Sequence, residues 1–291
     1  MLAVDTYVIG VMKLVKFIKE AVLKMKINLA RKKLLEGGII SGPSLYYPSP
    51  EIAEEAVQHG FDFVWIDWQH GAWSESSINA SMAPFVNTDT IPLVRPLGSD
   101  PAWIGRVLDL GALGIIIPMV ETVEECKSIV HAAKFPPEGR RSATGLRTAY
   151  HANHSYFDYT ENANDQILTV VMVETPKGVK NVRAMMGVEG VDCILIGPFD
   201  LERAVAGESM GDKPASSFRP SALAEELVQE VLTASNETGV AAGYVTNSPD
   251  EAEERAAQGF RMVCPGHDIT DLIEAFQRMK RCSERLDHLF K

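Results

Sequence analysis

Residues 170–175 read VVMVET, and residues 194–200 read ILIGPFD. Each is a short apolar run that ends in a carboxylate beside a residue typical of a turn or a helix start. Apolar runs of this length, bounded by Gly or Pro, are typical of fully buried strands in a parallel sheet. In such folds two carboxylates at neighbouring strand ends can share one hard divalent cation. Alternatively, Glu174 and Asp200 are acids of helix first turns, where they stabilise the helix dipole.

Strand-like and helical stretches alternate along most of the chain. The strand-like runs are residues 39–41, 63–66, 92–94, 114–117, 167–173, 192–196, 240–245 and 261–264. The helical patterns include residues 50–59, 74–84, 122–133, 177–186, 221–237, 249–258 and 269–280, with a further helix that Asp100 and Pro101 begin. Eight units of about 30 residues, without a break in composition, predict an α/β fold: a closed (β/α)8 TIM barrel. A doubly wound open sheet is the alternative, but no GxGxxG follows the first strand and no P-loop is present.

The overall composition limits the class of protein. The chain has 291 residues, of which 46% are hydrophobic, enough for one large core. Its net charge of −11 argues against a nucleic-acid partner, because phosphate binding needs a basic face. The cysteines show no CxxC pair and no zinc spacing, so we expect a reduced, cytoplasmic protein. We expect no membrane span and no secretory signal, since apolar runs of that length are missing.

The N-terminal segment differs in charge from the rest. Residues 1–36 carry eight Lys or Arg against three acids, which leaves about −16 on the remainder. Apolar residues at helical spacing predict an amphipathic helix over residues 8–35. Such a helix either lies on an anionic membrane or packs on the protein's own acidic body or on a neighbouring subunit, and we favour packing. We therefore expect an N-terminal helical extension over residues 1–27 and a barrel domain over residues 28–291.

Polar side chains follow several predicted strands. In a barrel the active site is built at the carboxyl ends of the strands. The second strand runs into His70 and the third ends at Arg95. Considered singly, the sequence position of His70 is typical of a packed or capping residue. That of Arg95 is typical of a surface residue in an ion pair. Beside the carboxylate pair of Glu174 and Asp200, they become candidates for a general base and an oxyanion-binding group.

Two further features are harder to place. Asp109 is a mid-helix acid between leucines, so it either caps its neighbourhood or hydrogen-bonds an imidazole and raises its basicity. Residues 134–165 form a predicted loop rich in Arg, Gly, Tyr, His and Asn. A connection of that length is usually functional or disordered.

Several motifs in register carry a resemblance to one family. They are GFDFVWID (60–67), VRP (94–96), VLDLGA (107–112), IPMV (117–120), AAKFPPEGRR (132–141), VEGVD (188–192) and IGPFDL (196–201). Over about residues 28–275 the chain resembles the HpcH/HpaI aldolases, which are class II pyruvate aldolases. The resemblance implies a barrel of the phosphoenolpyruvate/pyruvate-domain type. It also implies an aldehyde-lyase that cleaves a 4-hydroxy-2-oxo acid to pyruvate and an aldehyde, working as a homo-oligomer (a hexamer or trimer of dimers).

The resemblance also implies roles for single residues. His70 falls on the catalytic base, Arg95 on the arginine that stabilises the transition state, and Asp109 on the acid that tunes the base. Glu174 and Asp200 fall on the metal ligands. The 2-oxo acid site is implied at Met172 and at a helix start, where N–H groups suit a carboxylate; that helix start comprises Gly197, Pro198, Phe199 and Asp200.

The chemistry of these groups favours one type of cofactor. Two carboxylates suit a hard cation, Mg²⁺ or Mn²⁺, with Co²⁺ as a further candidate. A Schiff-base mechanism would need a lysine at a strand end, and none of the predicted ends offers one. We therefore expect a metal-stabilised enolate of the 2-oxo acid.

Departures from the family pattern leave the substrate open. The family has a Gln at the position of Met172 and a small residue at the position of Phe199, and its Trp near the first strand is not evident around residues 40–47. An oxaloacetate decarboxylase, or a carbon–carbon bond-forming enzyme like macrophomate synthase, is the alternative on the same metal site. A third alternative is a non-catalytic barrel that binds partners through its basic N-terminal helix.

Overall fold

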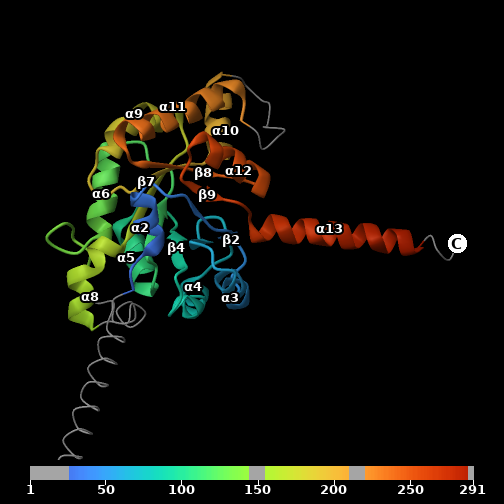
Figure 1. Ribbon diagram of the computed structural model, residues 1–291, viewed down its shortest axis with the longest axis horizontal. Coiled ribbons are helices and arrows are strands. Elements are labelled where there is room, and N and C mark those ends of the chain that lie inside the picture. The colour runs from blue at the N-terminus through green and yellow to red at the C-terminus, as the bar shows by residue number, and fades with distance from the viewer. Residues whose placement is uncertain (1–25, 144–154, 210–219, 288–291) are drawn as a thin grey trace, which may run out of the picture.

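A single parallel sheet forms the centre of the molecule. The computed structural model describes residues 26–143, 155–209 and 220–287 (Figure 1). Within them, nine strands follow the order β1-β9-β8-β7-β6-β5-β4-β3-β2, and every pairing is parallel. The carboxyl ends of all strands therefore share one edge, and the predicted α/β fold with a parallel sheet is confirmed. The strands are β1 (Ile40–Ser41), β2 (Ser44–Leu45), β3 (Phe63–Asp67), β4 (Ile91–Arg95), β5 (Gly114–Ile117), β6 (Leu168–Val173), β7 (Cys193–Ile196), β8 (Ala241–Val245) and β9 (Met262–Cys264).

Helices connect the strands and cover the sheet. Thr122 shows how they begin: its side chain accepts from the N–H of Glu125, and the Glu125 side chain accepts from the N–H of Thr122. In Figure 1, α9 and α11 lie side by side, as do α5 and α6. The helices are α2 (Leu29–Leu35), α3 (Pro50–Gln58), α4 (Glu75–Ala80), α5 (Pro101–Leu110), α6 (Val123–Ala133), α8 (Tyr156–Asn162), α9 (Pro176–Met186), α10 (Pro198–Ser209), α11 (Ala222–Thr238), α12 (Pro249–Gln258) and α13 (Asp268–Asp287). Two short 3₁₀ turns lie at η1 (Ala83–Phe85) and η2 (Ala163–Gln166).

The first predicted strand, residues 39–41, corresponds to β1, and a second short strand, β2, that was not predicted follows it, which explains nine strands where eight were predicted. Only Gly42 and Pro43 separate β1 from β2, yet β1 pairs with β9 and β2 pairs with β3. The segment 40–45 therefore connects the two ends of the strand order, and the sheet curls. A Cβ on Gly42 would lie 1.8 Å from the carbonyl oxygen of Phe63, so the close approach at this point requires glycine. Pro43 has no N–H to continue the ladder.

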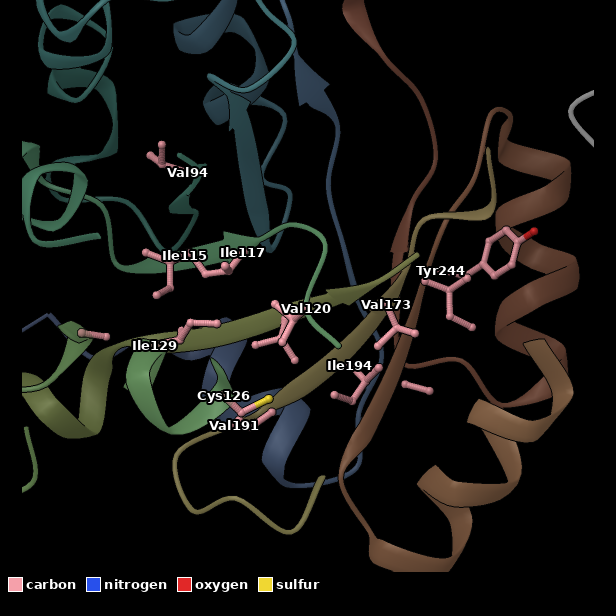
Figure 2. Close-up of a cluster of buried hydrophobic side chains, with 14 of the residues drawn as sticks. Val94, Ile115, Ile117, Val120, Cys126, Ile129, Val173, Val191, Ile194 and Tyr244 are labelled. Atoms are coloured by element: carbon pink, nitrogen blue, oxygen red, sulfur yellow. The ribbon is translucent and has the colours of Figure 1, made fainter. Parts of the chain in front are cut away.

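The strands are buried on both faces. On β6, Val171 and Val173 belong to the layer under the helices, whereas Val170 and Met172 belong to the cluster inside the curl. Figure 2 shows part of the outer layer, in which Val173 and other strand residues gather with Cys126 of α6. Double-sided burial is the reason that the strand sequences are continuously apolar.

The N-terminal end of the curled sheet is covered by α2. Ala30 and Leu34 are buried in the inner cluster, and the Asn28 side chain donates to the carbonyl of Leu113 at 3.0 Å. Most of the predicted helix over residues 8–35 lies outside the described residues. The part that is described packs on the protein itself.

The segment predicted as one long loop, residues 134–165, is partly helical. Ser155 caps α8, and the Tyr159 ring on α8 meets the Phe135 ring edge to face at 6.0 Å. Asn164 accepts from the Phe135 N–H at 2.7 Å and donates to its carbonyl at 3.0 Å. These contacts anchor the end of the segment, so the prediction of a loop throughout is wrong. Residues 144–154 of this segment lie outside the described part of the chain.

The last helix projects from the body. α13 begins beside β2, where Asp268 accepts from the N–H of Tyr46, and Figure 1 shows the rest of the helix extending away from the sheet. It exposes large apolar side chains at helical spacing, among them Leu272, Ile273, Phe276 and Met279. No helix among the described residues is long and apolar enough to cross a membrane.

Candidate active site

One cavity at the carboxyl ends of the strands collects nearly all of the predicted site residues. Its volume is about 430 Å³. Eight of the predicted residues line it: His70, Arg95, Met172, Glu174, Gly197, Pro198, Phe199 and Asp200. They come from different strand ends that share one edge of the sheet, as parallel order requires. The structure therefore brings these eight residues together in one cavity, and their roles stay predictions.

A pair of carboxylates stands at one side of this cavity. Glu174 follows β6 and is only 3% exposed, and its Oε2 accepts a hydrogen bond from the N–H of Met119 at 2.7 Å. The pKa of Glu174 is raised to about 7, mainly by burial; the nearby Asp200 contributes to the rise, whereas the Met119 N–H and Arg95 oppose it. A buried acid and a half-buried acid this close repel each other when both are ionised. A cation between them would relieve that repulsion.

The structure makes room for these carboxylates. A Cβ on Gly197 would lie 2.6 Å from Oε1 of Glu174, so the glycine leaves space that the carboxylate occupies. The donor set consists of carboxylate oxygens, which suits a hard divalent cation. Among the described residues, no three His, Cys, Asp or Glu side chains come together as a metal-binding group. The residues fit such a cation only if water or substrate oxygens complete its coordination.

Arg95 is anchored at the end of β4. It is 4% exposed, and its Nε donates to Oδ1 of Asp67 at 2.9 Å while Nη2 donates to Oδ2. The remaining Nη1 lies 3.5 Å from the sulfur of Met172. A thioether is a weak acceptor, so Nη1 has capacity left for a substrate oxygen. Asp67 itself is fully buried at the end of β3.

His70 lies in the turn that follows β3 and is exposed. Its backbone N–H donates to Oδ1 of Asp67 at 3.3 Å. Asp67 therefore contacts both the guanidinium of Arg95 and the turn that carries the imidazole. Its position as the last residue of an apolar strand, three residues before His70, is the signal in the sequence that identifies it.

Asp109 is the one predicted site residue that the structure places elsewhere. It lies on α5, and its carboxylate accepts from Nη2 of Arg141 at 3.0 Å. It lines a second cavity of about 740 Å³ together with Arg106, Lys127 and His131. Within one chain, Asp109 and His70 therefore belong to different cavities. That Asp109 acts on an imidazole stays a prediction.

Other residues in the first cavity were not predicted. His267, after β9, has its Nδ1 2.5 Å from Oγ of Ser44, and burial lowers its pKa below the usual value. Tyr46 meets the His267 ring edge to face at 5.9 Å, and burial raises the pKa of its phenol. The sequence does carry a signal for His267, because it follows the last predicted strand by three residues. The remaining unpredicted lining residues are Trp65, Val245, Asn247, Ile269 and Thr270.

Comparisons with known proteins agree with this geometry. The family model of the HpcH/HpaI aldolase/citrate lyase family matches residues 45–275. A 4-hydroxy-2-oxovalerate aldolase of Novosphingobium aromaticivorans is 32% identical over 266 residues, which cover 91% of this chain and 98% of that one. A crystal structure of an HpcH/HpaI aldolase/citrate lyase family protein from Burkholderia cenocepacia has a TM-score of 0.79 and 26% identity, covering 88% of this chain and 99% of the other. Macrophomate synthase shares the fold, with a TM-score of 0.75 and 24% identity over 91% of this chain and 92% of its own.

Proposed function

The chain belongs to the HpcH/HpaI aldolase/citrate lyase family, and on that premise we propose that it cleaves a 4-hydroxy-2-oxo acid to pyruvate and an aldehyde. One observation carries the proposal. A single cavity joins a carboxylate pair (the buried Glu174 and the half-buried Asp200), an anchored guanidinium (Arg95) and an exposed imidazole (His70). The 32% identity to a 4-hydroxy-2-oxovalerate aldolase supports this class of substrate.

The carboxylate pair is the proposed binding site of the cofactor. We propose that Glu174 and Asp200 hold a divalent cation, Mg²⁺ or Mn²⁺, with Co²⁺ as a further candidate. When bound, the cation supplies Lewis-acid stabilisation of the negative charge that develops on the 2-oxo acid during cleavage. The neighbouring acid and the burial of Glu174 support this role, since both favour a positive charge at that point.

Arg95 and the start of α10 bind and orient the substrate in this proposal. Nη1 of Arg95 donates to the enolate oxygen, because Nε and Nη2 are committed to Asp67. The N–H groups of Phe199 and Asp200 lie in the first turn of α10, ahead of the Leu201 N–H that donates to the Gly197 carbonyl at 3.1 Å. A helix start of this kind suits the substrate carboxylate.

His70 moves the proton. We propose that it removes the proton of the 4-hydroxyl group in cleavage, and that it exchanges the methyl protons of pyruvate in the reverse direction. General bases of this kind contribute roughly 10²- to 10⁴-fold to the rate. Its exposure at the rim of the cavity leaves it accessible to the reacting end of the substrate.

The position of Asp109 bears on assembly. We propose that the protein is a homo-oligomer, a hexamer or trimer of dimers, in which Asp109 reaches the His70 of a neighbouring copy. The separation of the two residues within one chain and the exposed apolar side chains of α13 support this.

We further propose that the curled sheet is a (β/α)8 barrel in which the segment 40–45 takes the place of the first strand. In this proposal residues 28–291 form one domain, and residues 1–27 are a helical extension. The free cysteines among the described residues support a cytoplasmic location.

Deuterium exchange into pyruvate tests the enzymatic proposal directly. The purified protein is incubated with pyruvate in D₂O, with Mg²⁺ or Mn²⁺ or with a chelator, and the methyl signal is followed by proton NMR. We expect cation-dependent loss of that signal, and we expect Glu174→Gln to abolish it. Glu54→Gln, at an exposed acid of α3, is the matched control. Full exchange in the presence of chelator would reject the cation site, and no exchange at all would reject enolate chemistry.

A second candidate function rests on two side chains. Met172 and Phe199 stand where the resemblance predicts an amide and a small residue, so the cavity suits a different 2-oxo acid as well. We propose oxaloacetate decarboxylation, or carbon–carbon bond formation of the macrophomate synthase kind, as the alternative. Turnover of oxaloacetate compared with that of several 4-hydroxy-2-oxo acids separates the two functions.

A further inference from the structure

The indole N–H of Trp65 has no hydrogen-bond partner among the described residues. Trp65 lies on β3, is 2% exposed, and lines the cavity that holds Glu174 and Arg95. Buried indole N–H groups are nearly always hydrogen-bonded, because an unsatisfied donor costs free energy. Trp73 follows that rule, since its Nε1 donates to the carbonyl of Leu45 at 2.9 Å. The exception at Trp65 therefore calls for an acceptor that the chain does not supply.

The surroundings of Trp65 indicate where that acceptor lies. The guanidinium carbon of Arg95 stands 4.8 Å from the centre of the Trp65 ring, and Nη1 of Arg95 lies 3.5 Å from the sulfur of Met172. These three side chains therefore contact one another in sequence, and all three line the cavity. Met172 carries no N–H and accepts only weakly. Trp65 and Arg95 both line the cavity, and neither the buried Nε1 of Trp65 nor Nη1 of Arg95 has a strong acceptor among the described residues.

We propose that Trp65 is a substrate-binding residue whose Nε1–H donates to an oxygen of the bound 2-oxo acid. The inference rests on the proposed function, because it takes a 2-oxo acid as the ligand. An indole nitrogen donates and never accepts, so it selects a carboxylate or carbonyl oxygen. Together with Arg95 it gives the anion two donors from neighbouring strands. Trp65 thereby supplies the hydrogen bond that Met172 is unable to make.

Trp65→Phe isolates the N–H from the ring. Phenylalanine keeps an aromatic face under Arg95 and most of the buried volume, but it has no donor. Pyruvate binding is measured by calorimetry with saturating Mn²⁺, and Mn²⁺ binding is measured separately. We expect pyruvate to bind roughly ten-fold or more weakly, as for loss of a hydrogen bond to a charged group, with unchanged affinity for Mn²⁺. Trp103→Phe is the matched control, because Trp103 lies on α5 against Trp68 and does not line this cavity.

A second measurement uses the wild-type protein alone. With ¹⁵N-labelled indole groups, the Nε1–H resonance of Trp65 is expected to shift downfield on addition of pyruvate, while that of Trp103 stays in place. The inference alone is overturned if Trp65→Phe binds pyruvate as tightly as wild type. It is also overturned if the Trp65 resonance does not move in the pyruvate-bound protein. A wild-type protein that binds no pyruvate in the presence of the cation overturns the proposed function and the inference together.

Discussion

Arg95 and Asp67 form a buried, two-pronged ion pair, in which Nε and Nη2 of the guanidinium each donate to one carboxylate oxygen. The strand register places them side by side, since Asp67 on β3 is paired with Arg95 on β4. Arg95 is 4% exposed and Asp67 is fully buried. Because a fork of this kind fixes the plane of the guanidinium, the pair determines where the third nitrogen, Nη1, points.

Asp67→Asn tests that anchor. The amide keeps one acceptor but loses the charge, which leaves the buried guanidinium without its counterion. We expect a loss of unfolding free energy of about 3 kcal/mol and a large loss of aldol cleavage. Urea unfolding measures the first and a coupled assay for pyruvate the second. Glu75→Gln is the control: its pair with Arg106 is exposed on both sides, so we expect a change below about 1 kcal/mol. Equal changes in the two variants would contradict the assignment.

His70→Asn separates catalysis from folding. His70 is exposed, so its loss is expected to leave the unfolding free energy nearly unchanged. The rate of methyl-proton exchange is expected to fall roughly 10²- to 10⁴-fold, as for loss of a general base. Calorimetry with Mn²⁺ is expected to give the wild-type affinity, since His70 is outside the carboxylate pair. His59→Asn, at another exposed histidine, is the control. Exchange within three-fold of wild type would remove His70 from the mechanism.

Glu174 gives the metal-free protein a distinctive pH dependence. Burial raises its pKa from 4.5 to about 7, so the folded chain binds this proton more tightly than the unfolded chain does. The unfolding free energy is therefore expected to fall as pH rises from about 4.5 through about 7, by at most roughly 3 kcal/mol from this group. Mg²⁺ or Mn²⁺ should reverse the loss, and should do so more strongly at pH 8 than at pH 5.

Denaturant titrations at pH 5 and pH 8, with and without the cation, measure this effect. Glu174→Gln is expected to flatten the pH dependence and to remove the response to the cation. The same slope in wild type and variant would show that another group is responsible.

The sequence indicates the edge of the sheet at which chemistry occurs. Continuously apolar strands imply a parallel sheet, and in a parallel sheet the carboxyl ends of all strands lie at the same edge. His70, Arg95, Glu174 and Asp200 could be predicted on that basis. Residues that reach the cavity by tertiary packing could not. Tyr46 arrives there through the short strand β2, which no periodicity reveals.

Asp109 illustrates a second limit. Helical periodicity marks it as an unusual acid but does not say which cavity its side chain enters, and in the structure that is the cavity of Arg141. Trp65 illustrates a third limit of prediction from the sequence. An aromatic residue inside an apolar strand is typical of the hydrophobic core, and only the missing hydrogen-bond partner of its Nε1 distinguishes Trp65 from a core residue.

Gly197→Ala tests the space that the carboxylate pair needs. The added methyl group would lie 2.6 Å from Oε1 and 2.8 Å from Cγ of Glu174. Glu174 is buried and held by the Met119 N–H, so its carboxylate must leave its place beside Asp200. We expect the affinity for Mn²⁺, measured by calorimetry, to fall roughly 10- to 100-fold. The fold should survive, because the clash falls on a side chain and not on the backbone.

Gly207→Ala, on the helix α10 that begins just after Gly197, is the matched substitution. Its Cβ would meet no atom within 4 Å, and alanine in a helix is favoured over glycine by about 0.5–1 kcal/mol. We therefore expect unchanged Mn²⁺ binding and equal or higher stability for this variant. If Gly197→Ala also binds Mn²⁺ like wild type, the cation does not depend on the position of Glu174. Because that position is what brings Glu174 beside Asp200, such a result would remove the physical basis for assigning the cation to this pair.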